Sequence, residues 1–174
     1  MSNKVFAAII ALIVIGAVGF TVVSKKQNPP AERPGTELPD NGREHLTADE
    51  KISYGGPEPP ASGKHGQPLP WQVYDQEIPD ENSIHNLEHG GIYISYSPDL
   101  PQEQIDKIKA LFSPPYSREG FSPTKAIVAP RAANESPIIL TSWLRNLKLD
   151  SYDEETIVNY YLQNIGKSPE PTAS

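Results

Sequence analysis

The stretch Gly91-Ile-Tyr-Ile-Ser-Tyr96, followed by Asp99-Leu-Pro-Gln-Glu-Gln-Ile-Asp-Lys-Ile-Lys-Ala-Leu-Phe112, decides the fold. Its first part alternates and is rich in β-branched and aromatic residues, which predicts a strand. Its second part repeats apolar residues at helical spacing, which predicts an amphipathic helix with Ile105, Ile108, Leu111 and Phe112 on one face. Asp99 is the expected N-cap of this helix, with Gln102 closing a capping box.

Working outward towards the C-terminus, the pattern predicts two more strands, Lys125 to Ala129 and Ile138 to Trp143, divided by a proline-bounded turn. Ser151, with Glu154 three positions later, is the expected cap of a last helix that Gly166 ends. The order strand, helix, strand, strand, helix indicates an α+β fold, in which a small mixed sheet is covered by two helices.

The part of the domain that precedes this unit is rich in loops. Residues 55–70 contain five prolines, at positions 57, 59, 60, 68 and 70, and therefore form neither a regular helix nor an interior strand. Gly63 and Gly66 allow sharp turns on either side of His65. We therefore expect His65 at the tip of a preorganised loop.

At the N-terminus, Val5 to Val23 is an uncharged apolar run between Lys4 and Lys25. At about 1.5 Å per residue, such a run just crosses a hydrocarbon core of ~30 Å and predicts one transmembrane helix. A cleaved signal peptide is the alternative, but its apolar region is usually about 7–15 residues long and ends in a small-residue cleavage pattern that is absent here. We expect a single-pass protein of the cell membrane with an extracytoplasmic C-terminal domain, in a bacterial envelope.

The domain organisation follows from composition. Residues 1–26 are the predicted anchor, 27–43 a proline-rich stalk, 44–166 one globular domain and 167–174 a disordered tail. The formal net charge of −7 argues against nucleic acid as a partner. A protein partner of unknown identity remains open.

The four histidines of the chain, His45, His65, His85 and His89, fall in one quarter of it, two of them within His85-Asn-Leu-Glu-His-Gly-Gly91. Residues four apart share a side of a helix or a strand, so His85 and His89 converge. Imidazole is the commonest metal ligand in proteins, and Glu88 adds a carboxylate that would serve as a ligand, as a hydrogen-bond acceptor for an imidazole or as a general base. The sequence points to metal binding without naming a reaction.

The absence of cysteine restricts the metal. Copper(I) prefers thiolate or thioether ligands, whereas this chain has no cysteine and Met1 is its only methionine. Zinc or copper(II) is therefore the expected ion. Small organic cofactors have no support in the sequence.

Three functions stay open at this point. The first is an extracytoplasmic domain that binds one metal ion through His65, His85 and His89, with His45 or Glu88 as a further ligand. If all four histidines bind, the site is closed and holds the metal, whereas three ligands leave a position open for envelope chemistry. The second is a metal-free interaction domain of an envelope assembly.

The third function is a metal-dependent hydrolase. Residues 85–89 fit the H-x-x-E-H pattern of inverted zinc peptidases, in which the glutamate activates water, and Glu88 would then be the catalytic residue. That pattern needs a real helix, and Pro79 and Gly90-Gly91 leave room for only a turn or two.

Several of these residues, taken in order, resemble the bacterial family called domain of unknown function 3105. They are His45, Tyr54, Pro59-Pro60-Ala-Ser62-Gly63-Lys-His65, His85-Asn-Leu-Glu88-His89-Gly90-Gly91, Ala129-Pro130-Arg131 and Trp143. The resemblance spans roughly His45 to Ile165 and implies a one-pass membrane protein with this domain after the anchor. It implies no activity, but it marks as the positions to test His45, His65, His85, Glu88 and His89. Leu144 stands where the family pattern has glycine, so the resemblance implies no functional residue around Trp143.

Overall fold

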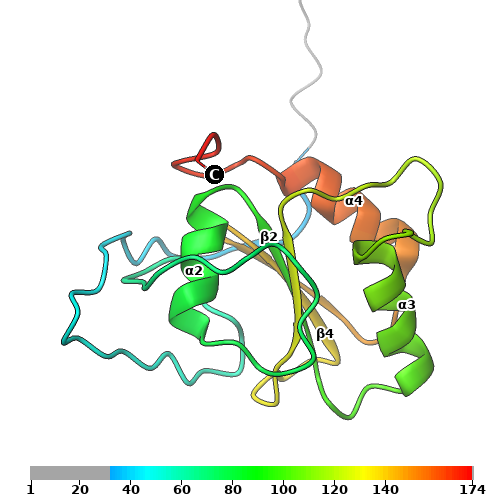
Figure 1. Ribbon diagram of the computed structural model, residues 1–174, viewed down its shortest axis with the longest axis horizontal. Helices are drawn as coiled ribbons and strands as arrows, with labels where there is room; N and C mark the ends of the chain where they lie inside the picture. The colour runs from blue at the N-terminus through cyan, green and yellow to red at the C-terminus, as the bar shows by residue number, and fades with distance from the viewer. Residues whose placement is uncertain (1–31, 174) are drawn as a thin grey trace, which may run out of the picture. The chain divides into compact units, whose positions relative to one another are not determined.

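The computed structural model describes residues 32–173 (Figure 1). Its elements, in chain order, are β1 (Thr36–Glu37), α2 (Asp80–Glu88), β2 (Ile92–Tyr96), α3 (Gln102–Phe112), β3 (Ala126–Pro130), β4 (Ile138–Ser142), β5 (Arg145–Leu149) and α4 (Glu154–Asn164).

The strands form one mixed sheet in the order β1-β5-β4-β2-β3. β2 and β3 are parallel and are connected through α3, while the other neighbouring pairs are antiparallel. The predicted α+β class and small mixed sheet are thus confirmed. Within residues 32–173, however, three helices accompany the sheet, where the sequence predicted two.

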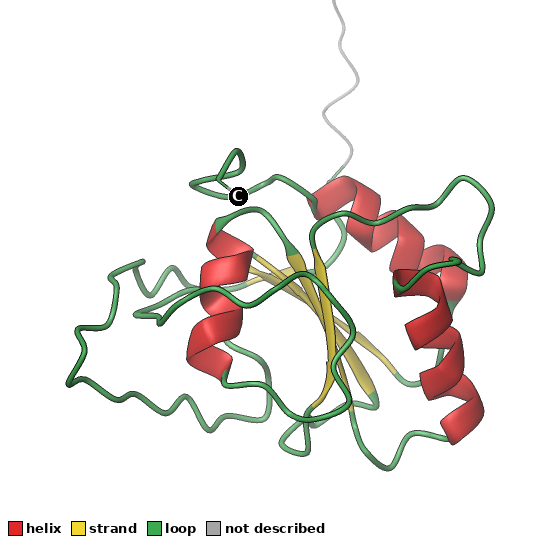
Figure 2. Ribbon diagram, viewed as in Figure 1, coloured by secondary structure: helices red, strands yellow, loops and turns green. Residues whose placement is uncertain are grey.

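β2 is the central strand, and all five of its residues are buried. Its side chains alternate between the two faces of the sheet. Ile94 packs in the larger core with α3 and α4, whereas Tyr93 packs on the opposite face with Ile84 and Leu87 of α2. The helices accordingly lie on both faces of the sheet, α2 on one and α3 and α4 on the other (Figures 1 and 2).

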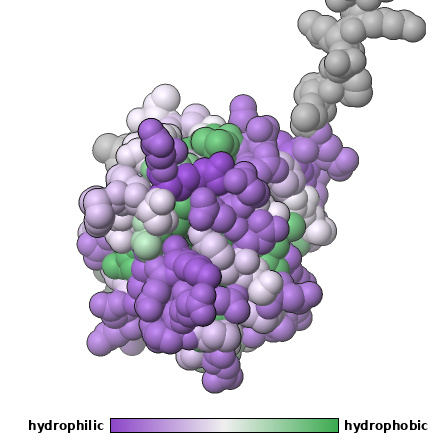
Figure 3. Space-filling view, turned by 90° about the vertical axis from the view of Figure 1, so that its right-hand side faces the viewer, coloured by the Kyte–Doolittle hydropathy of each residue, from purple (hydrophilic) through white to green (hydrophobic). Residues whose placement is uncertain are grey.

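The helices on the larger core present the predicted apolar residues, but they begin later than the sequence suggested. Asp99 lies in a turn that the Leu100 amide closes on the carbonyl of Ser97, so Pro101 occupies the N-cap of α3 without a side-chain cap. Asp153, not Ser151, caps α4, because its carboxylate accepts from the Thr156 amide. The outer face of this layer is mostly hydrophilic (Figure 3).

α2 is longer than the turn or two that the sequence predicted. Pro79 occupies its N-cap position, where a missing amide costs nothing, and Gly90 follows its end with a φ of +82°. The two residues that suggested a break therefore border nine helical residues. The helix buries Ile84 and Leu87 against the sheet, and it carries His85 and Glu88.

The segments predicted as a stalk and a tail make defined contacts where the structure describes them. Thr36–Glu37 of the stalk pairs antiparallel with β5 as an edge strand. The tail packs against the domain, because the Glu170 amide donates to the carbonyl of Glu88 at 3.0 Å and the Lys125 ammonium donates to that of Pro171 at 3.1 Å. Both segments are held mainly by polar contacts. Because they contain few apolar residues, the sequence gives no sign that they pack against the domain.

The predicted membrane anchor at residues 5–23 lies outside the described residues. Among residues 32–173, no helix has the length and apolar character needed to cross a bilayer.

Gly91 forms a tight contact next to the histidine cluster, and it gives a first prediction. A Cβ atom at this position would overlap the Trp71 ring and lie 3.0 Å from the carbonyl oxygen of Asn86. We expect Gly91→Ala to lower the free energy of unfolding by about 1–3 kcal/mol through overpacking, measured by urea denaturation. Gly56→Ala is the matched control, since its nearest atom is 3.6 Å from the added Cβ. Equal losses in the two variants would contradict the steric explanation.

Candidate metal centre

Two loop segments and one helix build the site. The segments around His45 and His65 run parallel: the Leu46 amide donates to the carbonyl of His65 at 2.7 Å, and the His65 amide donates to that of Glu44 at 2.8 Å. This bridge brings the two imidazoles to a ring-centroid distance of 4.6 Å. His85 and Glu88 come from α2.

The loop that carries His65 is held in shape by Tyr54, whose hydroxyl donates to the carbonyl of Lys64 at 2.6 Å. Gly63 has a φ of +127°, and a Cβ there would lie 2.5 Å from the Tyr54 oxygen. Only glycine fits that position. The Asn86 side chain of α2 then exchanges two hydrogen bonds of 2.8 Å with the backbone of Leu69, which fixes the loop against the helix.

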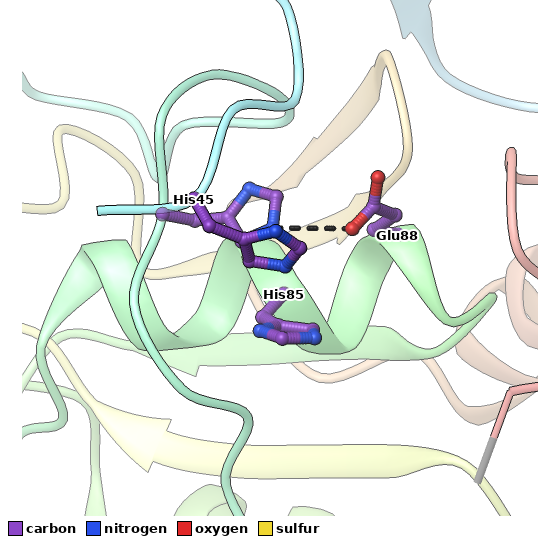
Figure 4. A group of neighbouring side chains, drawn as sticks. His45, His85 and Glu88 are labelled. Carbon is purple, nitrogen blue, oxygen red and sulfur yellow. Dashed lines mark ion pairs between the residues drawn. The ribbon is translucent and has the colours of Figure 1, made fainter. Parts of the chain in front are cut away.

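One ligand atom from each of four residues converges in the resulting space. The donor atoms of His45, His65, His85 and Glu88 all lie within 4.8 Å of one another. The ring of His85 is 4.9 Å from that of His45 and 4.8 Å from that of His65 between centroids. Figure 4 shows His45, His85 and Glu88 gathered around this space. His45 is exposed, whereas the other three residues are buried, with Glu88 only 1% exposed.

Backbone carbonyls fix the tautomer of two of these histidines. Nδ1 of His65 lies 2.9 Å from the oxygen of Gly63, and Nδ1 of His85 lies 2.6 Å from that of Gly66. A carbonyl oxygen only accepts, so both Nδ1 atoms must carry hydrogen and donate. In the neutral imidazoles, each Nε2 is then left with a free lone pair, as in metal-binding histidines.

The lone pair of His65 faces a carboxylate. Its Nε2 lies 3.1 Å from Oε2 of Glu88, the contact dashed in Figure 4, and neither atom has a well-formed hydrogen bond among the described residues. Burial lowers the pKa of His65, which favours the neutral ring over an ion pair with Glu88. Two buried acceptors that face each other repel unless a cation lies between them. A metal ion bound between them would supply that cation.

His89 belongs to a neighbouring group. Its Nε2 lies 3.1 Å from Nε2 of His85, but its donor atom is grouped with those of Glu88 and Glu170, again within 4.8 Å. The structure thus divides the five residues that the sequence singled out into two adjoining sets that share Glu88. Sequence reasoning missed Glu170, because this residue lies in the segment expected to be disordered.

The geometry favours Glu88 as a ligand over Glu88 as a general base. The inverted zinc peptidase pattern needs both histidines on one ion and the glutamate beside it. Here Glu88 joins the group of His85, while His89 is the C-cap residue of α2 and joins Glu170.

The buried histidines predict that the metal-free protein loses folding stability in acid. Burial lowers the pKa of His65 and of His89 below the ordinary value of 6.5. As the pH falls below about 6.5, these histidines therefore bind protons in the unfolded chain but not in the folded chain. The free energy of unfolding falls as a result. Carboxylates titrate mainly below about pH 5 and do not obscure this window. We expect a lower urea midpoint at pH 5.5 than at pH 7.5 in the presence of a chelator; equal midpoints would contradict the assignment.

Comparison with known proteins gives a family and no function. No curated protein matches the chain, and no solved structure matches it. The model of the family described as "Protein of unknown function (DUF3105)" matches residues 45–174. The match begins at His45 and extends beyond Ile165 to include Glu170, so it covers all six residues of the two groups. The chain therefore belongs to the DUF3105 family.

Proposed function

We propose that this domain binds one transition metal ion, zinc or copper(II), through His45, His65, His85 and Glu88. The observation that carries the proposal is the buried contact of 3.1 Å between Nε2 of His65 and the Glu88 carboxylate. The other ring nitrogen of His65 already donates to a backbone carbonyl. Because Nδ1 of His65 is used in this way, Nε2 and the carboxylate oxygen face each other as two acceptors. Acceptor atoms without donors are what a cation site requires.

The donor set argues for the metal. Three imidazoles and one carboxylate, without any thiolate, suit zinc or copper(II) and disfavour copper(I). Four protein ligands would fill a tetrahedral shell, which is typical of sites that hold a metal. Because His45 is exposed while its partners are buried, it is the ligand through which the ion enters and leaves. The role that follows is metal holding or buffering.

The location completes the proposal. The apolar run at residues 5–23 would tether the domain to the cell membrane, with the metal-binding domain on the extracytoplasmic side. The domain would then hold metal at the envelope surface.

The test uses the full-length chain in mild detergent, purified without a histidine tag. Elemental analysis as purified, followed by titration with zinc and with copper(II), should give tight binding of at least one equivalent per chain. The His65→Ala, His85→Ala double variant should lose this tight equivalent. A wild-type chain that folds, as judged by circular dichroism, yet takes up neither ion would refute the proposal and leave the metal-free interaction domain as the next hypothesis.

A further inference from the structure

We infer a second cation position beside the first, formed by Glu88, His89 and Glu170, so that Glu88 bridges two ions. This inference rests on the proposed function, because it adds an ion to the same cluster. The donor atoms of the three residues lie within 4.8 Å of one another. A carboxylate has two oxygens, and each can hold one ion of a pair about 3.5–4 Å apart.

Burial separates this group from an ordinary cluster of surface charges. Glu88 is 1% exposed and His89 8% exposed. Oε2 of Glu88 and Nδ1 of His89 are both buried without a hydrogen-bond partner among the described residues. Buried polar atoms in proteins almost always have partners. Oε2 of Glu88 faces the first position, so the unpartnered Nδ1 of His89 is the atom that indicates a missing ligand at the second.

Glu170 is held in place by its own backbone. The Glu170 amide donates to the carbonyl of Glu88 at 3.0 Å, and the Gly166 amide donates to that of Gly90 at 2.8 Å. The Lys125 ammonium joins the carbonyl of His89 at 3.0 Å to that of Ala173 at 2.5 Å. The C-terminal segment is therefore fixed across the end of α2, with Oε2 of Glu170 4.0 Å from Nε2 of His89.

The two positions are coupled through the His85–His89 contact. Nε2 of His85 has a lone pair because Nδ1 donates to Gly66, so at 3.1 Å the Nε2–H of His89 must donate to it in the metal-free protein. This tautomer leaves Nδ1 of His89, the buried atom without a partner, with the lone pair that a second ion needs. An ion on Nε2 of His85 takes the acceptor of this hydrogen bond, so filling the first position also changes the contacts of the His89 ring.

The second position should be the weaker one. It offers one imidazole and two carboxylates, one of them shared, and the Glu170 side chain is 48% exposed. Repulsion between two neighbouring divalent cations lowers its affinity further. A zinc-class divalent ion that exchanges with solvent on the Glu170 side fits this chemistry.

Zinc titration of the full-length chain, followed by calorimetry and by elemental analysis after gel filtration, tests the inference. The wild type should bind two zinc ions per chain, the second more weakly. Glu170→Gln should bind one, with the affinity of the first step unchanged. Glu103→Gln is the matched control: it also removes an exposed glutamate, on α3 and away from the cluster, and should still bind two. In the two-zinc form, X-ray absorption should detect a zinc–zinc distance of about 3.5–4 Å.

The outcomes separate the second position from the first. One zinc per wild-type chain, unaffected by Glu170→Gln, would overturn the bridged pair and leave the proposed function intact. No bound zinc would overturn the inference, and no uptake of copper(II) either would defeat the proposed function itself. Two zinc ions retained by Glu170→Gln, or both lost together, would show that Glu170 does not define a separate second position.

Discussion

His85→Ala is expected to lower the affinity of the chain for zinc or copper(II) by roughly a hundredfold or more. Its Nε2 is the donor that α2 contributes between His45 and His65, and its orientation is fixed by the carbonyl of Gly66. Structural zinc sites bind with about 10–16 kcal/mol, so one ligand in four accounts for about 3 kcal/mol, or a factor of about 100. Competition with a chelating indicator measures the constant directly.

A second pair of variants separates ligand loss from damage to the helix. Glu88→Gln keeps the size of the side chain but removes the negative charge, and should weaken metal binding strongly. Glu81→Gln makes the same change two turns earlier on α2, at a residue outside both donor groups, and should leave the affinity unchanged. Wild-type affinity in a folded His85→Ala variant would show that His85 is not a ligand.

How much of this arrangement the sequence could predict depends on how each element is held. The alternation of β2 and the apolar stripe of α3 are local signals of burial, and both elements were predicted nearly to their ends. β5 was missed because Arg145-Asn-Leu-Lys-Leu149 is only partly buried and has no β-branched or aromatic residue, the residue types that mark a strand in the sequence. β1 was missed because a two-residue edge strand carries no periodicity.

The residues of the site were likewise predicted where the signal is local and missed where it depends on tertiary contacts. The four histidines were visible as a cluster in the sequence, and the spacing of His85 and His89 implied that they converge. Their separation into two groups depends on which loop meets α2, and Gly66 and Leu69 make that contact. The carbonyl of Gly63 and the His45–His65 bridge then place the other two rings, and sequence spacing reveals neither contact. Glu170 carried no local signal, because its segment is fixed by backbone carbonyls and Lys125.

The start of α2 is fixed by a buried ion pair, and breaking it should have the largest effect on stability. Arg131, at the end of β3, donates from Nε and Nη2 to the two carboxylate oxygens of Asp80 at 3.0 and 2.8 Å, and from Nη2 to the carbonyl of Gly56 at 2.8 Å. Its side chain is 6% exposed and that of Asp80 14%. Arg131→Met is expected to lower the free energy of unfolding by about 3–5 kcal/mol, because Asp80 is left buried without its counter-charge.

Urea denaturation of the metal-free chain measures this loss, and Arg118→Met is the matched control. Arg118 also makes a two-pronged contact, at 2.8 and 3.2 Å with Glu155, but the glutamate side chain is 82% exposed and solvent screens the pair. Its removal should change stability little. Comparable losses in the two variants would show that burial does not set the strength of the Asp80 contact.

Added metal shows whether Arg131 acts on the fold or on the site. An ion that binds only the folded chain stabilises it by about 2.7 kcal/mol at a hundred times its Kd. Arg131 lies in neither donor group, so the wild type and Arg131→Met should gain equally at the same saturation. A folded variant that gains nothing from zinc would mean that the ion pair positions the ligands of α2 directly, because the helix would then keep its structure while losing the placement of His85 and Glu88.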